Sequence, residues 1–531
     1  MNKKIQFKSC GCVFPTTDGH IDYDIDIANM NLECKETWNL IGSGNTKGCF
    51  QLESRLGQMM SKKLKPQNIE QLAALISIMR PGCLEAYRDG KSVSDHYIDK
   101  KNGSESVDYF HPSLEPVLKT TYGEMIYQEQ AMEIARVIAG FNLEDADVLR
   151  KAIGKKKVDL MTKVKKSFIS GAEKAHIVSN DIAEEIFGWI EKSQRYSFNK
   201  SHAISYALNA YLSAYSKCHF PSYFFASYLK FAPDKIDPMK EIYELINNCR
   251  EMDINVYKPD FKKIDRTFAL DNDKNIYFGL TNIKGVGNSV YNKIQTLVKD
   301  LDIDKMSYIE IILNILTNIN QTASKAMISV GCFDYVGVGR KEMLFHFGLL
   351  NDLTKKEKGI LIANTNELKT VKDCLVFLED KVNIRRKQKI LALSHTLKNP
   401  PYKLDDSCLW IADQENQLLG ISITCSKIDE YSLDNVNTSC KEINADKCLY
   451  KSMILGVEIK DVNIIKTKRG ANPGQEMCFA KVCDNTGSTD IVVFPDKYSQ
   501  YKNIITSDNT AIVKLEKSKN GSMILNKIWQ L

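Results

Sequence analysis

The stretch that decides the fold is Ser197-Phe198-Asn199-Lys200-Ser201-His202-Ala203-Ile204-Ser205-Tyr206-Ala207. It opens as a polar, cationic turn, and residues 203–217 contain neither Gly nor Pro, which predicts a helix capped by Asn199 or Ser201. Unpaired N–H groups and the positive end of the helix dipole collect at such a start, beside Lys200, where a phosphate could rest. His202 and Tyr206 lie four residues apart on one helix face, where they could hold a planar group.

An ordinary structural role accounts for the same residues. A helix start that is buried in a core also needs a cap, with His202 hydrogen-bonded inside the protein and Lys200 in solvent. Capping patterns are permissive, so this stretch alone leaves both interpretations open.

The composition is that of a globular protein from a reducing compartment. The 531 residues are 43% hydrophobic and 26% charged, enough for three or four domains, and the net charge of +6 is mild. The fifteen cysteines are odd in number and scattered, without a C-x-x-C pair, which favours free thiols in the cytoplasm. No apolar run is long enough to cross a bilayer and no signal-peptide core follows the first residues, so we expect no membrane partner.

The first 33 residues raise two questions about metals. Cys10, Cys12 and His20 are ligand types that zinc accepts, but a fourth ligand is not evident, and we predict no metal site. Carboxylates alternate at Asp22, Asp24 and Asp26, as a two-metal site on a strand would require. We interpret them as an acidic surface segment.

Cations gather in the next 130 residues. Arg80 precedes Pro-Gly at a helix end, where its guanidinium could reach a phosphate or serve as an ordinary surface cap. From residue 150 to residue 166 there are eight cations and one acid, and the cations include Arg150, Lys151, Lys155, Lys156 and Lys157. Such a run is usually a solvated face, and a track for a polyanion is the competing interpretation.

Two further patterns suggest contact with nucleic acid. Ile283-Lys284-Gly285-Val286-Gly287 precedes helical spacing and is typical of a helix-hairpin-helix, whose backbone N–H groups contact phosphate; a tight turn is the alternative. Between residues 452 and 531 the period changes to two, and five short strands with a basic first loop, containing Lys468 and Arg469, predict a barrel of the OB type. Such barrels often bind single strands.

Taken together, the motifs resemble the C-terminal half of the alpha subunit of DNA polymerase III, the C-family replicative polymerase of bacteria. The resemblance covers residues 24–531. The motifs that carry it occur in the family's order: Gly48-Cys49-Phe50-Gln51-Leu52-Glu53-Ser54, Met79-Arg80-Pro81-Gly82, Ile126-Tyr127-Gln128-Glu129-Gln130, Leu149-Arg150-Lys151-Ala152-Ile153-Gly154-Lys155-Lys156, residues 197–207, Gly279-Leu280, residues 283–287, Gly331-Cys332-Phe333-Asp334 and Val493-Phe494-Pro495.

The resemblance implies roles for individual residues. Arg80, Arg150, Lys151 and Lys155 would face the triphosphate or the adjoining DNA backbone. The binding site for the incoming dNTP would be lined by Asn199, Lys200, Ser201, His202 and Tyr206. Duplex phosphate would lie against Gly285 and Gly287, and we add Lys156, Lys157, Lys284, Lys468 and Arg469 as DNA contacts from their charge.

In the family, the palm supplies the aspartates that hold two Mg²⁺ ions for attack by the primer 3′-OH. The resemblance places Asp22, Asp24 and Asp26 on the acidic stretch between palm and fingers, so we predict no catalytic residue here and expect Mg²⁺ mainly through a palm-bearing partner chain. A sliding clamp is a further candidate partner, although residues 388–393, Gln-Lys-Ile-Leu-Ala-Leu, lack the usual terminal aromatic.

The predicted fold is multidomain and mainly α. Its parts are an irregular N-terminal segment (1–33), a helical fingers domain (34–232), a helical region with the helix-hairpin-helix module (233–395), a linker region (396–448) and an OB-fold (449–531). We predict part of a split replicative DNA polymerase that binds dNTP and primer-template DNA, from a phage or mobile element in a bacterial cytoplasm. The alternative is a non-catalytic DNA-binding protein derived from such a polymerase.

Overall fold

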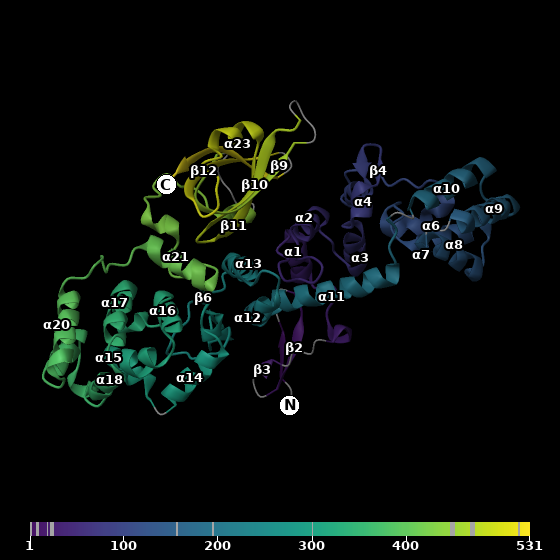
Figure 1. Ribbon diagram of the computed structural model, residues 1–531. Helices are drawn as coiled ribbons and strands as arrows, with labels where there is room; N and C mark the ends of the chain where they lie inside the picture. The colour runs from purple at the N-terminus through teal and green to yellow at the C-terminus, as the bar shows by residue number, and fades with distance from the viewer. Residues whose placement is uncertain are drawn as a thin grey trace. The chain divides into compact units, whose positions relative to one another are not determined.

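The computed structural model of the chain describes residues 3–6, 10–17, 20–21, 26–155, 158–193, 196–299, 301–445, 452–467, 473–518 and 521–531. It forms two compact units, Met1–Pro221 and Ser222–Leu531 (Figure 1). None of the helices among these residues is long and apolar enough to cross a membrane.

The first unit begins with a small antiparallel sheet of β1 (Lys3–Gln6), β2 (Val13–Thr17) and β3 (His20–Ile21). We predicted an irregular segment here. That prediction missed the sheet because its strands are short and show no alternation of apolar and polar residues.

Helices make up most of the rest of this unit. They are α1 (Lys35–Ser43), α2 (Arg55–Leu64), α3 (Ile69–Ile78), α4 (Pro81–Glu85), α5 (Val93–Lys101), α6 (Glu115–Leu118), α7 (Gln128–Ala139), α8 (Leu143–Lys155), α9 (Val158–Ala175), α10 (Asn180–Ser193) and α11 (Lys200–His219), with a two-stranded ribbon of β4 (Tyr87–Arg88) and β5 (Lys91–Ser92). One core packs α6–α10 together and another packs α11 on α1–α3.

The long helix α11 runs along α1 and α3 (Figure 1). Its small side chains Ala203, Ala207, Ala210 and Ala214 recur every three or four residues and are fully buried. Facing them is α3, where residues 72–78 are all buried. Because alanines add little bulk, the two helices approach closely and α11 is held along most of its length.

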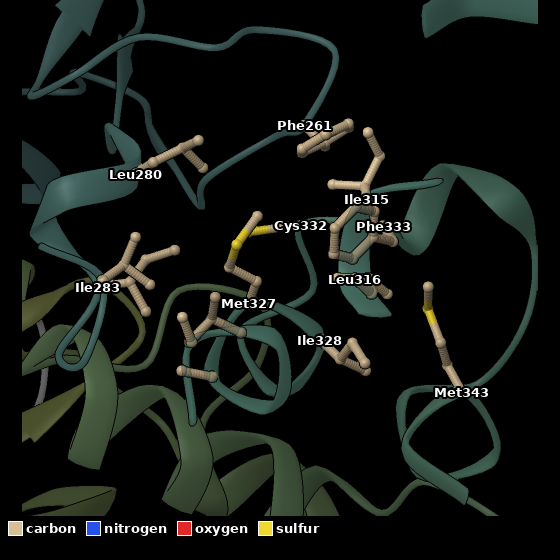
Figure 2. Packing of buried hydrophobic residues seen from close by; sticks show 14 of the residues in the cluster. Phe261, Leu280, Ile283, Ile315, Leu316, Met327, Ile328, Cys332, Phe333 and Met343 are labelled. Carbon is tan, nitrogen blue, oxygen red and sulfur yellow. The ribbon is translucent and has the colours of Figure 1, made fainter. Parts of the chain in front are cut away.

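The second unit joins a helical region to a barrel. Its elements before the barrel are α12 (Pro221–Phe231), α13 (Pro238–Glu251), a small sheet of β6 (Val256–Tyr257), β7 (Ala269–Leu270) and β8 (Ile276–Tyr277), α14 (Asn288–Val298), α15 (Tyr308–Glu310), α16 (Gln321–Ser329), α17 (Arg340–Asn351), α18 (Lys355–Ile362), α19 (Val371–Glu379), α20 (Ile384–Lys398), α21 (Cys408–Leu419) and α22 (Cys440–Asn444). Figure 2 shows Ile283, the first residue of the predicted hairpin, and Leu280, which precedes it, in the core with Met327 and Phe333.

The predicted linker region, 396–448, is more structured than expected. Its helix α21 carries Glu415, which is fully buried and pairs with the buried Arg340 of α17 at 2.8 Å. Arg340 also pairs with Asp334 at 2.8 Å. A buried charge needs such partners, so α21 is fixed to the helical core and does not act as a free connection.

The C-terminal barrel contains β9 (Met453–Lys466), β10 (Glu476–Asp484), β11 (Gly487–Val493), β12 (Thr510–Lys517) and β13 (Met523–Gln530). It is closed in the order β10-β11-β13-β12-β9, with only β11 and β13 parallel among these strands, and α23 (Pro495–Tyr501) lies between β11 and β12 in the chain. Five closed strands fit an OB-fold. The predicted fold class, mainly helical with a C-terminal β-barrel, is confirmed.

Candidate nucleotide-binding and DNA-binding surfaces

Of the two residues predicted to cap α11, Asn199 is the cap. Its side-chain oxygen accepts a hydrogen bond from the backbone N–H of His202 at 2.9 Å. Ser201 supports the cap, because its hydroxyl donates to the same oxygen at 2.7 Å. The order Asn-Lys-Ser-His therefore sets the first turn of the helix.

A carboxylate already occupies the start of α11. Glu129, at the beginning of α7, accepts from the backbone N–H of Lys200 at 2.9 Å and from the side-chain amide of Asn199 at 2.8 Å. The amides of Lys200 and His202 are thus both engaged within the protein. These two amides are therefore not free to bind a phosphate, which differs from the sequence interpretation.

Two rings of α11, His202 and Tyr206, continue a row that begins with Phe198 and ends with Phe50. We call these four rings the aromatic row. The ring centroids of Phe198 and His202 are 5.5 Å apart, those of His202 and Tyr206 4.1 Å, and those of Tyr206 and Phe50 5.3 Å. His202 and Phe50 are exposed, and the other two are half-buried. An accessible row of rings can stack against a planar base.

Two cations border the aromatic row. The exposed Arg80 holds its guanidinium carbon 3.8 Å from the centre of the Phe198 ring, as the N-cap of α4. The Lys200 ammonium lies 5.8 Å from the centre of the Tyr127 ring and 3.8 Å from a carboxylate oxygen of Glu70. The structure therefore brings together Arg80, Asn199, Lys200, Ser201, His202 and Tyr206, a set with rings for a base and positive charge for phosphate.

Residues that sequence reasoning did not single out hold this surface in place. Phe198 pairs with the chain before α7, donating to the carbonyl of Ile126 at 2.9 Å and accepting from the N–H of Gln128 at 3.0 Å. Phe50 donates its N–H to the hydroxyl of Ser213 on α11 at 2.9 Å. The family motifs quoted above contain Phe50 and Ile126–Gln128, but only the fold shows that they meet α11.

Lys217 is a second residue that the sequence analysis missed. Its side chain is fully buried on α11, and its ammonium donates to the backbone carbonyls of Asn45 and Lys47, both at 2.9 Å, and to the side-chain oxygen of Asn45 at 3.0 Å. These acceptors belong to the turn that leads to Phe50. The only sign of this role in the sequence was the presence of a lysine within the Ala- and Tyr-rich residues 203–217.

Arg150 and Lys151 belong to a different part of the unit. They lie on α8, which packs in the core of α6–α10, and both pair with Asp147 at 2.8 Å. No contact among the described residues joins them to the aromatic row. The backbone of Lys155 ends α8, which continues through Gly154 rather than breaking there, and Lys156 and Lys157 lie outside the described residues.

Of the three alternating carboxylates in the acidic segment, Asp26 is the one among the described residues. Asp26 caps a short 3₁₀ turn, accepting from the N–H of Ala28 at 2.9 Å, and Asp22 and Asp24 lie outside the described residues. Clusters of three or more metal-ligand groups elsewhere in the described chain combine cysteine and histidine, with a single glutamate. Since Mg²⁺ prefers oxygen ligands, these clusters do not suit it.

The predicted hairpin presents backbone groups on the surface of the second unit. Gly285 and Gly287 are exposed on either side of the buried Val286, and Gly285 has a φ of +95°, which favours glycine. Gly287 caps α14, and the exposed Lys284 stands beside it. Exposed glycines beside a lysine at the start of a helix are the type of loop that can contact phosphate.

Two other predicted contacts are not placed on a surface. Lys468 and Arg469, in the first loop of the barrel, lie outside the described residues. The candidate clamp-binding residues 388–393 lie within α20, where Ile390 and Leu393 are buried.

Comparison with known proteins identifies the relationship. A family model described as bacterial DNA polymerase III alpha subunit finger domain matches residues 13–176, and a helix-hairpin-helix motif matches residues 253–343. DNA polymerase III subunit alpha of Aquifex aeolicus is 32% identical over 495 residues, and that of Pseudomonas aeruginosa is 30% identical over 529 residues. The chain is homologous to the C-terminal region of bacterial DNA polymerase III alpha subunits.

The similarity covers most of this chain and less than half of each relative. It extends over 92% of the chain and 38% of the Aquifex aeolicus protein, and over 93% of the chain and 42% of the Pseudomonas aeruginosa protein. The Borreliella burgdorferi protein gives a similar match, 31% identical over 92% of this chain and 40% of the relative. The predicted family is confirmed.

Proposed function

We propose that this chain supplies the nucleotide-selecting and DNA-holding part of a template-directed DNA polymerase. The observation that carries the proposal is the aromatic row with Arg80 and Lys200 at its border. Rings that can stack on a base and cations that can meet its phosphates together suit an incoming dNTP. A protein that only held DNA would need no such combination.

The second unit would hold the primer-template. The exposed glycines Gly285 and Gly287 would offer backbone N–H groups to duplex phosphate, and Lys284 would offer its side-chain charge. The likeness of this turn to helix-hairpin-helix motifs supports this use. Arg150 and Lys151 on α8 would meet the triphosphate or the DNA backbone, exchanging their pairing with Asp147 for phosphate.

The metal-binding carboxylates would come from a palm-bearing partner chain. Mg²⁺ held there would activate the primer 3′-OH and neutralise the triphosphate. Asp26 is engaged as a cap, so we assign it no part in this chemistry. We place the assembled enzyme in the cytoplasm of a bacterial host, as part of a phage or mobile-element replication system, with a sliding clamp as a further partner.

The first experiment is primer extension with Mg²⁺ by the purified chain, alone and with a palm-bearing chain from the same replication system. Fluorescence anisotropy on the same primer-template measures DNA binding in parallel. We expect DNA binding by the chain alone and extension only by the pair. Extension by the chain alone would place the catalytic carboxylates within it and refute the split assignment.

A matched pair of variants tests the nucleotide site. Tyr206→Leu removes a ring of the aromatic row, and Tyr87→Leu makes the same change at an exposed tyrosine of the same unit. Since stacking on one base is worth about 1–3 kcal/mol, Tyr206→Leu should raise the KM for dNTP about 5- to 150-fold while DNA affinity is retained. Equal effects of the two variants on KM, or DNA binding without any extension by the pair, would favour the non-catalytic DNA-binding alternative.

A further inference from the structure

Three cysteines and a histidine from separate parts of the chain converge in the first unit. Cys10 and Cys12 precede and adjoin β2, Cys34 is the N-cap of α1, and His219 is the last residue of α11. Their sulfur atoms and one ring nitrogen all lie within 4.8 Å of one another. Cys12 and Cys34 are buried, and Cys10 is half-buried.

The spacing of these atoms is compatible with a tetrahedral ligand shell. With Zn–S bonds of about 2.3 Å and Zn–N bonds of about 2.0–2.1 Å, neighbouring tetrahedral ligands stand about 3.6 Å apart for S and N and about 3.8 Å for two S atoms. The sulfur of Cys34 is 3.4 Å from Nε2 of His219. A disulfide would require two of the sulfurs at about 2.0 Å, and all three cysteines are free thiols here.

The surroundings also suit a metal centre. The side-chain amide of Asn31 donates to the sulfur of Cys12 at 3.6 Å, and the hydroxyl of Tyr211 donates to the backbone carbonyl of Asn31 at 2.7 Å. The rings of Phe14 and Tyr215 lie 5.4 Å and 4.4 Å from the His219 ring. A hydrogen bond to a ligand sulfur and an apolar shell are typical of structural metal sites.

We propose that Cys10, Cys12, Cys34 and His219 bind one zinc ion. Three thiolates and an imidazole are a closed, four-coordinate set that leaves no position for water, which makes the site structural rather than catalytic. The pattern was invisible in the sequence because Cys34 and His219 lie far from Cys10 and Cys12 in the chain. The ion would join the residues that lead into β2 to the N-cap of α1 and the last residue of α11. The proposal is independent of the function proposed above.

A second cluster shares one ligand with this site. Glu36 and Cys218 also approach His219, with ligand atoms within 4.8 Å of one another. That set offers a single sulfur and a carboxylate, and a fourth ligand does not accompany it among the described residues. Because soft thiolates select zinc more strongly than a mixed set does, we assign the ion to the three-cysteine cluster.

The test is the metal content of the full chain, purified without chelator, by elemental mass spectrometry. We expect one zinc per chain. Reconstitution with Co²⁺ in its place should give the ligand-field and charge-transfer absorption of a tetrahedral cobalt thiolate. Cys34→Ser should lower the zinc affinity by at least about 100-fold, since loss of a second-shell partner alone costs about 10- to 100-fold.

Two other variants test whether the three-cysteine cluster, rather than the second cluster or another buried thiol, holds the zinc. Cys83→Ser removes a buried free thiol of the same unit outside the cluster and should keep the zinc, and Cys218→Ser should keep it too. If Cys34→Ser fails to fold, two measurements still test the site. They are the zinc content of Cys10→Ser, which alters the half-buried ligand, and the cobalt spectrum of the unaltered chain. Zinc lost from Cys218→Ser but kept in Cys10→Ser would place the ion in the second cluster. A metal-free chain with all thiols titratable, or one lighter by two hydrogens from a disulfide, would overturn the proposal.

Discussion

Replacing the buried Lys217 by methionine should loosen the turn that carries Phe50 to the aromatic row. The methionine side chain has a similar length and apolar stem, so it fills the same space without a charge. What it removes is the ammonium that donates at 2.9–3.0 Å to three oxygens of Asn45 and Lys47. The turn then loses its hydrogen bonds to α11 through Lys217 and keeps the one between Phe50 and Ser213.

The magnitude follows from the contacts. Hydrogen bonds from a charged donor contribute about 1.5–3 kcal/mol each, so three give a gross loss of about 4.5–9 kcal/mol. Removing the buried charge returns several kcal/mol of desolvation cost, which leaves a net loss of about 2–4 kcal/mol. The effect is local, because the acceptors belong to one turn.

Hydrogen exchange read by mass spectrometry is the suitable assay, since it resolves peptides within a chain of two units. A loss of about 2–4 kcal/mol corresponds to exchange about 30- to 900-fold faster for amides of residues 44–52. Lys174→Met, the same change at an exposed lysine of α9, is the control and should leave that peptide unchanged. Unaltered protection of residues 44–52 in Lys217→Met would refute the inference that the hydrogen bonds of Lys217 hold this turn in place.

Three further predictions concern the second unit. A Cβ at Gly279 would overlap the backbone of Thr267, whereas one at Gly287 meets nothing within 4 Å, so Gly279→Ala should lower the unfolding temperature of this unit and Gly287→Ala should leave it within experimental error. Burial lowers the pKa of His346 from its ordinary value of 6.5, so the unfolded state binds the proton more tightly than the folded state. The protection of α17 from hydrogen exchange should therefore fall as the pH drops below 6.5, and His346→Gln should abolish this dependence. Lys284→Gln should weaken primer-template binding and reduce the slope of log affinity against log salt by about 1; an unchanged slope would exclude a phosphate contact.

Local patterns were sufficient for much of the fold. The barrel was predictable because its strands alternate in period two, and α11 because an Asn cap precedes residues without Gly or Pro. The hairpin at Lys284 was recognisable for the same reason: its glycines and buried apolar residues lie within five positions of one another.

Contacts between distant residues were not predictable. Glu129 was visible only as part of a motif, and nothing near it in the chain shows that it caps a helix 71 residues away. The same holds for Glu415, whose partner Arg340 is 75 residues distant and turns a predicted linker into part of a core. Such pairings depend on how helices pack, and side-chain periodicity carries information about which face is buried but not about what lies against it.

The candidate site depends on α11 as a whole rather than on its first turn. The alanine stripe fixes the helix against α3, and because these side chains cannot change rotamer, the helix has little freedom to slide or roll. Ser213 and Lys217 then fix the turn before Phe50, two and three turns beyond Tyr206, and His219 ends the helix in the cysteine cluster. The geometry of the aromatic row is therefore set by residues that touch no nucleotide in the proposed function. Selection of a base by such a row requires rings that stay in register, and a single, laterally packed helix provides that register better than separate loops.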